Sequence, residues 1–560
     1  MATEYVNVDD YVLDKNNAAK GIRAAIQYAR EHKKQEIIFG AGTYYLTDYV
    51  TIDTVSIAHD DGCGDIREKD CHLLLEDFDG ITLKGRIAED GSPMTILAGY
   101  NSQIVQTQLP AILWVNSCVN LTLKNLAFTR EPETASAGIV RAIEKDTIIV
   151  EVFEGLPCYD NMGAYCMNRF NLMDKSLLGA SLTFGFGFDT RFIKIGDRQL
   201  SLTDSAIAGI VKVGDGLSWH QAGKTDFQLF LGNCTNLIFE NIRVYNTNSF
   251  AVLTENCKNI SADRLIIKPK GNQLFTGPRD GWKIYRCTGK ILIDNCHTEG
   301  VRMDGQNIHS NFMIVQEVLS ANSVLCTCKY APIPLTDGYK MEFYDGNKIY
   351  ENEIDHWEFV GGYSTQTIQS NNKTAGVAKV GTANHITLYQ IQFKRPLENF
   401  IQKGCLMTPL CWEPNLYICK NSTFHNIAGA GHLLRCGEVT IEKCQYKNLM
   451  NAGILMGAEF DTHCEGGHAV NVKISECTFD NCGFKPRYGD FGCGCIAIKS
   501  QGFQEPLNQH ILIEKNQFLN SKIALEIRDA QDVQIRNNYF DNITNRYIIE
   551  EISTKDIAID

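Results

Sequence analysis

The sequence has no long hydrophobic run and no block of basic residues, and its first residues do not follow the pattern of a secretory leader. Its longest apolar-dominated stretches are about ten residues, well short of the roughly 20 residues that cross a bilayer. The N-terminus, MATEYVNVDDYVLDKNN, has no basic region followed by an apolar core. We therefore expect a cytoplasmic protein that makes no membrane contact.

An excess of positive charge is also missing. The formal net charge is −13, and lysine and arginine are not clustered, which excludes the electrostatic footprint of a nucleic-acid binder. Apolar residues make up 44% and charged residues 21% of the chain, the usual mixture for a globular protein with a large core. A neutral ligand fits this charge balance better than a polyanion.

Metal-site spacing is absent although cysteine is abundant. The chain has 21 cysteines, an odd number spread too widely for a disulfide scaffold. Cys326 and Cys328, like Cys493 and Cys495, are separated by one residue, whereas structural zinc sites usually place two to four residues between paired ligands. We expect reduced thiols that act as small core residues, no metal and no cofactor.

The sequence does contain a six-residue repeat. Its first and third residues are apolar, its second is of any kind, its fourth and fifth are polar, and its sixth is Asn or Cys. It reads Val439, Ile441 and Cys444 in one copy. Further copies begin at Leu416, Val472, Ile511 and Val533, and looser ones at Ile81, Leu121, Leu237, Ile260 and Ile291. Short alternating strands at an irregular period in the twenties to thirties are typical of a right-handed parallel β-helix.

The last column of the repeat predicts a ladder of small polar side chains at a corner of the coil. An inward amide there can bond backbone groups of its own turn and of the neighbouring coil, and a cysteine fills the same space. We therefore interpret Cys296, Cys444 and Cys477 as ladder members and not as nucleophiles.

The remaining segments predict a cap and two insertions in an otherwise all-β chain. Residues 17–32 carry an amphipathic helical pattern with Asn17 as its N-cap, suited to covering the first coil. The repeat is interrupted from 121 to 237 and from 291 to 416, where alternating patterns predict small β-barrel or sandwich modules. The expected parts are cap and first coils (1–129), first module (130–230), central coils with the active site (231–311), second module (312–410) and last coils (411–560).

The central coils hold the candidate chemistry. Asp280 and Asp304 are 24 residues apart, about one coil, and consecutive coils lie roughly 4.8 Å apart. Inverting glycoside hydrolysis uses two carboxyls about 6.5–9.5 Å apart, one to protonate the leaving oxygen and one to activate water. Both residues begin Asp-Gly pairs, so the alternative is that they are turn residues bonding local amides.

Aromatic faces and planar hydrogen-bonding groups are what bind sugars. The residues of this kind near the acid pair are the candidate substrate contacts Arg264, Trp282, Arg302, Asn307, His309, Asp461 and Glu465.

Four stretches carry a resemblance to a known family: GAGTYYLTDYVTIDTVSIAHDDG, VNLTLKNLAFTREP, RDGWKIYRCTGKILIDNCHTEGVRMDGQNIHS, and VTIEKCQYKNLMNAGILMGAEFDTHCEGGHAVNVKISECTFDNC. Their order resembles glycoside hydrolase family 110, exo-acting α-1,3-galactosidases with a β-helix and inserted β modules. The resemblance implies that Asp280 is the general acid and Asp304 the second member of an Asp pair, with Met303 in place of the first.

Two other classes of function remain open. One is a β-helix polysaccharide lyase or epimerase, although a tight acidic cluster for calcium is missing. The other is a carbohydrate-binding solenoid without catalysis. In each case the expected partner is an oligosaccharide or glycan, and the expected assembly is a homodimer.

Overall fold

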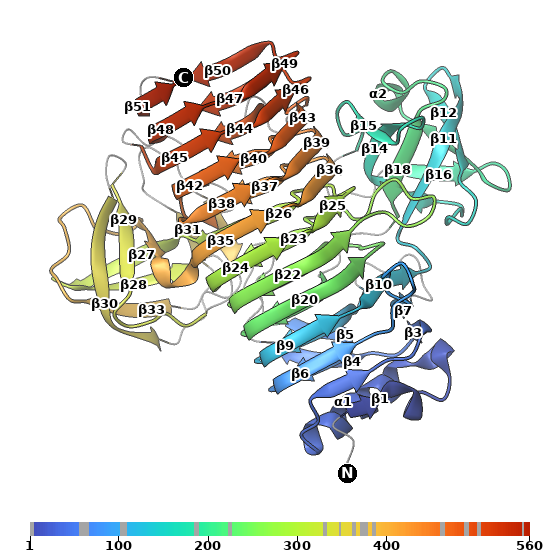
Figure 1. The fold of residues 1–560 in the computed structure, drawn as a ribbon, viewed down its shortest axis with the longest axis horizontal. Coiled ribbons are helices and arrows are strands. Elements are labelled where there is room, and N and C mark those ends of the chain that lie inside the picture. Colours follow the sequence, from blue (N-terminus) through green and yellow to red (C-terminus); the bar gives the residue numbers. More distant parts are fainter. Residues whose placement is uncertain are drawn as a thin grey trace.

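The chain is wound into a long coil of parallel strands from which two β modules project. The computed structural model describes residues 5–54, 67–100, 109–183, 190–221, 227–328, 333–345, 349–360, 366–369, 379–383, 388–459, 465–485, 492–500, 506–550 and 554–560. The coil runs the length of the molecule, with the first module on one flank and the second on the other (Figure 1). Parallel strands in successive turns and a right-handed β-helix were the predicted architecture, and it is confirmed.

Each turn of the coil contributes strands to three faces. Face 1 consists of β2 (Glu36–Ile38), β6 (Asp79–Lys84), β9 (Val119–Lys124), β20 (Thr235–Val244), β22 (Lys258–Ile267), β24 (Thr288–Asp294), β35 (Pro414–Lys420), β38 (Val439–Glu442), β42 (Val470–Ser475), β45 (Asn508–Glu514), β48 (Ala530–Arg536) and β51 (Thr554–Ile559). Strands β20 and β22 are long enough to bend into face 2.

Face 2 lies next along the chain in each turn. It consists of β3 (Gly42–Leu46), β7 (Thr95–Tyr100), β10 (Leu126–Glu131), the ends of β20 and β22, β25 (His297–Glu299), β36 (Thr423–Ile427), β39 (Gln445–Leu449), β43 (Thr478–Cys482), β46 (Gln517–Leu519) and β49 (Tyr539–Asp541).

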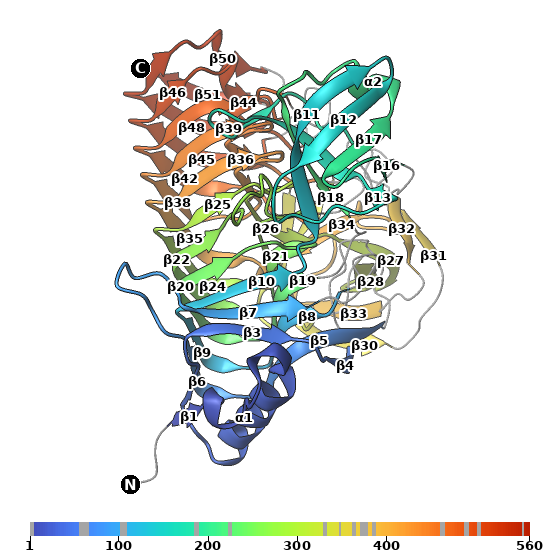
Figure 2. The same ribbon diagram turned by 90° about the vertical axis from the view of Figure 1, so that its right-hand side faces the viewer.

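Face 3 closes each turn. It consists of β5 (Arg67–Glu76), β8 (Ala111–Asn116), β19 (Phe227–Gly232), β21 (Phe250–Glu255), β23 (Trp282–Tyr285), β26 (Gln306–Asn311), β37 (His432–Leu434), β40 (Ile454–Met456), β44 (Gly494–Ile498), β47 (Ile523–Ile527) and β50 (Asn545–Ile549), with β4 (Val50–Thr54) antiparallel to β5. Figure 2 labels β8, β19 and β21 of this face beside the strands of face 2.

The N-terminal helix covers the open first turn, as predicted. Helix α1 (Ala19–Glu31) contacts β1 (Tyr5–Asn7), β2, β3 and β5, and its buried side chains include Ile22, Ala25, Ile26 and Ala29. The expected N-cap was wrong: Ala18 occupies that position, and Asn17 ends a 3-10 turn, η2 (Lys15–Asn17). The side chain of Asn17 instead accepts a hydrogen bond from Thr47.

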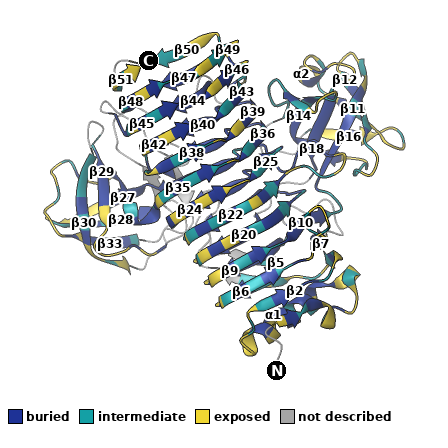
Figure 3. Cartoon of the chain, in the orientation of Figure 1, coloured by how far each residue is buried: buried dark blue, intermediate teal, exposed yellow. Residues whose placement is uncertain are grey.

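Apolar side chains of the three faces meet inside the coil in one continuous core. Alternation places one side of each strand inward, so buried and exposed residues follow one another along the outer strands (Figure 3). Neighbouring turns align Leu121 with Leu237, Leu237 with Ile260, and Ile260 with Ile291, which confirms the weaker repeat copies.

One copy of the repeat was assigned one residue out of register. The pattern predicted Leu416, Ile418 and Asn421 as inward residues, but Tyr417 pairs with Val439 and Cys419 with Ile441, and Tyr417 and Cys419 are fully buried. Because side chains alternate, a shift of one residue exchanges the two sides of a strand. Leu416 and Ile418 match the apolar positions of the pattern, but Tyr417 and Cys419 are the residues that fill the interior here.

The predicted corner ladder is present. The backbone N–H of Cys296 donates to Ser422 Oγ at 3.1 Å, that of Cys444 to Cys477 Sγ at 3.4 Å, and that of Cys477 to Asn516 Oδ1 at 2.9 Å. Each side chain thus satisfies the backbone of the preceding turn, and all described cysteines are free thiols.

Removing a ladder amide should therefore destabilise the coil. Asn516 is fully buried, and its amide also donates to the Ile474 carbonyl at 3.0 Å. We expect Asn516→Ala to lower the free energy of unfolding by about 2–3 kcal/mol, because it leaves a buried N–H and a buried C=O unpaired. Denaturant unfolding measures the loss, with exposed Gln517→Ala as control; equal losses in the two variants would contradict the ladder's role.

The first module interrupts the chain between β10 and β19. Its eight-stranded sheet consists of β11 (Ala135–Glu144), β12 (Thr147–Val152), β13 (Met162–Gly163), β14 (Tyr165–Asn171), β15 (Ser176–Leu178), β16 (Arg191–Lys194), β17 (Gln199–Thr203) and β18 (Gly216–His220), with the short helix α2 (Ser205–Ala208). The Asn426 side chain, on face 2, binds it by donating to the Lys175 carbonyl at 3.0 Å and accepting from Leu177 N–H at 3.1 Å.

The second module interrupts the chain directly after β26. It is a closed barrel of β27 (Met313–Ser320), β28 (Ser323–Cys328), β33 (Leu388–Phe393), β30 (Ile349–Val360), β29 (Lys340–Tyr344) and β34 (Leu406–Pro409), with a side hairpin of β31 (Gln366–Gln369) and β32 (Lys379–Ala383). Its own core includes Trp412, in the 3-10 turn η3 (Leu410–Trp412) that leads back to β35. Both predicted modules are thus present, one an open sheet and one a barrel.

Candidate active site

The two predicted acids occupy equivalent positions on neighbouring turns. Trp282 of β23 pairs in register with Gln306 of β26, so Asp280 and Asp304 each precede their strand by two residues. Gly281 N–H donates to the Asp304 carbonyl at 2.9 Å. The pair therefore lies where face 2 turns into face 3, with the carboxyls on one wall of the coil.

Each carboxylate is anchored by a backbone N–H of the next turn. Asp280 Oδ1 accepts from Asp304 N–H at 3.2 Å, and Asp304 Oδ1 accepts from Ala430 N–H at 2.8 Å. Asn307 Nδ2 lies 3.4 Å from Asp280 Oδ2. Each carboxyl therefore uses one oxygen to hold a backbone N–H of the following turn, 24 residues away for Asp280 and 126 residues away for Asp304. These contacts join turns of the coil, whereas the alternative reading expected bonds to local amides.

Burial and mutual repulsion make Asp280 a weaker acid than a free aspartate. Asp280 is 4% exposed. Burial, and then the charge of Asp304, raise its pKa to about 6, against the opposing charges of Arg279 and Lys283. Such a carboxyl retains its proton at a higher pH than a solvated one, as a general acid must.

Lys283 carries a positive charge into the same buried region. Burial lowers its pKa to about 8, although the neighbouring Asp280 favours the charged form. Its ammonium lies 5.4 Å from the centre of the Phe250 ring and 5.3 Å from that of Tyr285. Arg279 lies over Phe250 at 5.1 Å, so both cations flank Asp280 against an aromatic surface.

His309 and Glu465 form a second polar group at the other end of β26. His309 Nε2 lies 3.4 Å from Glu465 Oε1, and Arg435 forms an ion pair with the same carboxylate. Burial, with the charges of Lys283 and Arg435, lowers the pKa of His309 well below its ordinary value. His309 is thus a neutral imidazole, with Nδ1 2.6 Å from the Ser310 carbonyl oxygen.

Arg302 connects the acid-bearing turn to the first module. It lies two residues before Asp304, is 1% exposed, and donates from Nη2 to the Thr183 carbonyl at 3.2 Å. Burial, and then its charge, lower the pKa of His220 on β18 to about 3. Arg302 therefore ties the turn that bears Asp304 to the first module.

Two expected substrate contacts, Trp282 and Arg264, lie away from the acid pair. Trp282 points into the core, where it packs edge-on against Phe239 and donates to Thr254 Oγ1 at 3.2 Å, so it is no sugar platform. Arg264 lies on the opposite corner, between faces 1 and 2, half-exposed and paired with Asp263 at 2.9 Å. Asp461 lies outside the described residues.

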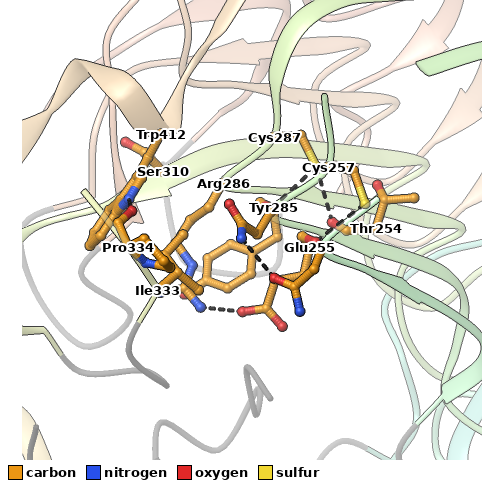
Figure 4. A network of polar contacts seen from close by, with 12 residues as sticks. Thr254, Glu255, Cys257, Tyr285, Arg286, Cys287, Ser310, Ile333, Pro334 and Trp412 are labelled. Atoms are coloured by element: carbon orange, nitrogen blue, oxygen red, sulfur yellow. Dashed lines mark hydrogen bonds and ion pairs between the residues drawn. The ribbon is translucent and has the colours of Figure 1, made fainter. Parts of the chain in front are cut away.

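Sequence reasoning missed the charged residues that surround the acids. Arg279 and Lys283 flank Asp280 in RDGWK, which was the available signal. Glu255 and Arg286 form a buried ion pair from neighbouring turns, and Arg286 stacks 5.4 Å from Trp412 of the second module (Figure 4). Nothing local marked this pair, because its partners are 31 residues apart.

Within the described parts of the chain, no group of three His, Cys, Asp or Glu side chains is arranged to hold a metal ion. No helix in those parts has the length and hydrophobicity needed to span a membrane.

Comparison with known proteins supports the architecture and a family relationship. The model of the right handed beta helix region matches residues 410–554. The chain is 22% identical over 552 residues to Alpha-1,3-galactosidase A of Shewanella woodyi, covering 92% of this chain and 83% of the relative. It is 22% identical to the protein of that name in Akkermansia muciniphila, covering 75% and 69%, and 22% identical to Alpha-1,3-galactosidase B of Bacteroides thetaiotaomicron, covering 84% and 75%.

Similarity at this level along nearly the whole chain, together with the parallel coil and its two modules, agrees with the resemblance found from motifs. The chain is a divergent β-helix protein like those of glycoside hydrolase family 110.

Proposed function

We propose that the protein is a glycoside hydrolase that removes a terminal, α-galactoside-like sugar from an oligosaccharide or glycan. Asp280 donates the proton to the leaving oxygen, and Asp304 activates the attacking water. The observation that carries the proposal is the alignment of these two carboxyls on adjacent turns, with a pKa of about 6 at Asp280. The names of the relatives support the choice of sugar.

The surroundings of the pair suit a neutral substrate. Asn307 and His309 are uncharged groups able to bond sugar hydroxyls, and Glu465 is neutralised by Arg435. Arg302, through the first module, positions the turn that bears Asp304. Trp282 and Arg264 are not part of this proposal.

The spacing of the pair bears on the stereochemistry. Neighbouring turns lie about 4.8 Å apart, and each carboxyl accepts a hydrogen bond from the turn that follows it. An inverting reaction uses carboxyls roughly 6.5–9.5 Å apart, which is wider than the spacing of the turns. Retention, typical of a separation of roughly 5–5.5 Å, would mean that Asp304 attacks the sugar itself.

The experiment is hydrolysis of aryl α- and β-glycosides, with the released anomer followed by proton NMR. We expect turnover of an α-galactoside and β-galactose as the first product. An α-galactose product would overturn the inverting assignment, and no released sugar from any aryl glycoside or α-galactosyl oligosaccharide would overturn the proposed activity.

The pH dependence should follow the proton on Asp280. Because Asp280 acts in its protonated form, kcat/KM should fall as the pH rises through about 6. Lys283 lowers the pKa of Asp280, so Lys283→Gln should raise that pKa and move the alkaline limb to higher pH. Lys290→Gln, on the exposed side of face 1, is the control, and a limb that does not move would contradict the assignment of Asp280.

A lyase or epimerase is the second candidate, and Lys283 is what favours it. A buried lysine with a pKa of about 8 can take a proton from the carbon next to a uronic acid carboxylate. A lyase would release an unsaturated sugar, which absorbs in the ultraviolet, and would not act on neutral galactosides.

A further inference from the structure

Arg130 is a buried cation with which no carboxylate of the described residues forms a pair. It lies near the end of β10, 1% exposed. Its Nη2 donates to the Pro110 carbonyl at 2.9 Å, and Nε has no hydrogen-bond partner. Burial lowers its pKa to about 10, and among the described residues no carboxylate opposes that shift.

His72 approaches the same space from β5. A Cβ atom added to Gly99 would lie 3.2 Å from Arg130 Nη1 and 3.5 Å from His72 Cδ2. The side chains of Arg130 and His72 therefore both border the space above Gly99, which has no side chain of its own. His72 is 1% exposed. Its Nδ1 lies 2.9 Å from the Asp48 carbonyl oxygen, and Nε2 has no hydrogen-bond partner.

The charges around His72 leave a positive excess. They are Arg130 of β10, Arg23 of α1, and Asp48 of the β3–β4 loop. Arg23 pairs with the Asp48 carboxylate at 2.7 Å, which leaves Arg130 uncompensated. Arginine is almost never fully buried unless it is paired, and an unsatisfied buried group in a native protein points to an unseen water or ion.

A water molecule would complete the hydrogen bonds of Arg130 and His72 but would leave the positive charge of Arg130 without a countercharge from the described residues. Isolated buried ions are costly, by several kcal/mol each, whereas a small anion supplies the missing countercharge. We propose that Arg130 and His72 form a buried binding site for a small inorganic anion, of the size and charge of chloride, at the root of the first module.

The site should bind its anion together with a proton. Since Nδ1 faces a carbonyl oxygen, it carries the hydrogen of the neutral ring, and Nε2 is then an acceptor that repels an anion. Protonation turns Nε2 into a donor. Burial and the neighbouring cations hold the pKa of His72 at about 4 without an anion, so anion affinity should rise as the pH falls.

Bromide identifies the site directly because its anomalous scattering separates it from water. In crystals of the full chain soaked in sodium bromide, we expect an anomalous peak between the Arg130 guanidinium and His72 Nε2. In solution, raising chloride from about 1 to 100 mM at constant ionic strength, with gluconate as the balancing anion, should raise the Tm by about 2 °C.

Variants separate the site from general salt effects. Arg130→Gln should remove both the peak and the chloride-specific rise in Tm, and His72→Gln should keep the peak but remove the pH dependence of the rise. Water density without an anomalous signal would overturn the proposal, as would an equal chloride response in wild type and Arg130→Gln. If Arg130→Gln does not fold, the bromide map of the wild type decides, and these results are independent of glycosidase activity.

Discussion

Asp280→Asn and Asp304→Asn should each lower turnover by roughly 10²–10⁴-fold, the contribution of a positioned acid or base, while the protein still folds. Asparagine keeps an oxygen that can accept from the next turn, at Asp304 N–H for position 280 and at Ala430 N–H for position 304. Only the proton chemistry is removed. Initial rates on an α-galactoside, with circular dichroism of each variant, measure the effect.

Asp294→Asn is the matched control for this pair. Asp294 lies on the exposed side of face 1, where its Oδ1 accepts from Asn421 at 2.8 Å, so its substitution makes the same chemical change outside the site. Its turnover should equal that of the wild type. If the two site variants lose no turnover, Asp280 and Asp304 are turn residues only; if the wild type binds glycans without turnover, the protein is a binding solenoid.

Glu255→Gln should lower the free energy of unfolding by about 3–5 kcal/mol, because it leaves the buried Arg286 without its countercharge. The side chains of Arg286 and Glu255 are 0% and 3% exposed. Arg286 also lies 4.4 Å from the centre of the Tyr285 ring and 5.4 Å from that of Trp412. Loss of the pair should therefore loosen the second module from the coil, which hydrogen exchange of the barrel strands would detect.

Two further variants test the cause of that loss. The double variant Glu255→Met with Arg286→Met removes both charges, so it should be more stable than Glu255→Gln alone. Glu240→Gln breaks a pair with Lys124 in which both side chains are 34% exposed, and should cost at most about 1 kcal/mol. Equal losses in Glu255→Gln and Glu240→Gln would contradict the role of burial.

Much of the coil could be predicted because its signals are local. Val439, Ile441 and Cys444 repeat with the same spacing in later turns, and that spacing alone set their register. The Leu416 copy failed for a local reason too, since Leu416 and Ile418 fit the apolar pattern although the core residues, Tyr417 and Cys419, lie one position later. The modules were recognised because they interrupt the repeat.

The site was predictable only in part. That Asp280 and Asp304 lie on adjacent turns followed from their separation of 24 residues, which equals one turn. Arg302, Asn307 and His309 lie near them because they are close in sequence, and the roles of all five residues stay predictions. Trp282 was misjudged because it lies in strand β23, where the alternation of side chains turns it into the core. Asp280 lies in the turn before that strand, so nearness in sequence did not put the two side chains on the same side. Arg264 was misjudged because proximity in sequence does not reveal which corner of the coil a residue occupies.

The sequence by itself determined the parallel coil, its cap, its insertions and the acid pair, since each follows from hydrophobic period or from spacing along one strand and turn. Only the tertiary structure decided which charges surround the acids, that Glu465 is held by Arg435 and His309, and that Arg130 is buried beside His72. These contacts join residues from separate turns and modules, and their energies depend on burial, which no local pattern records.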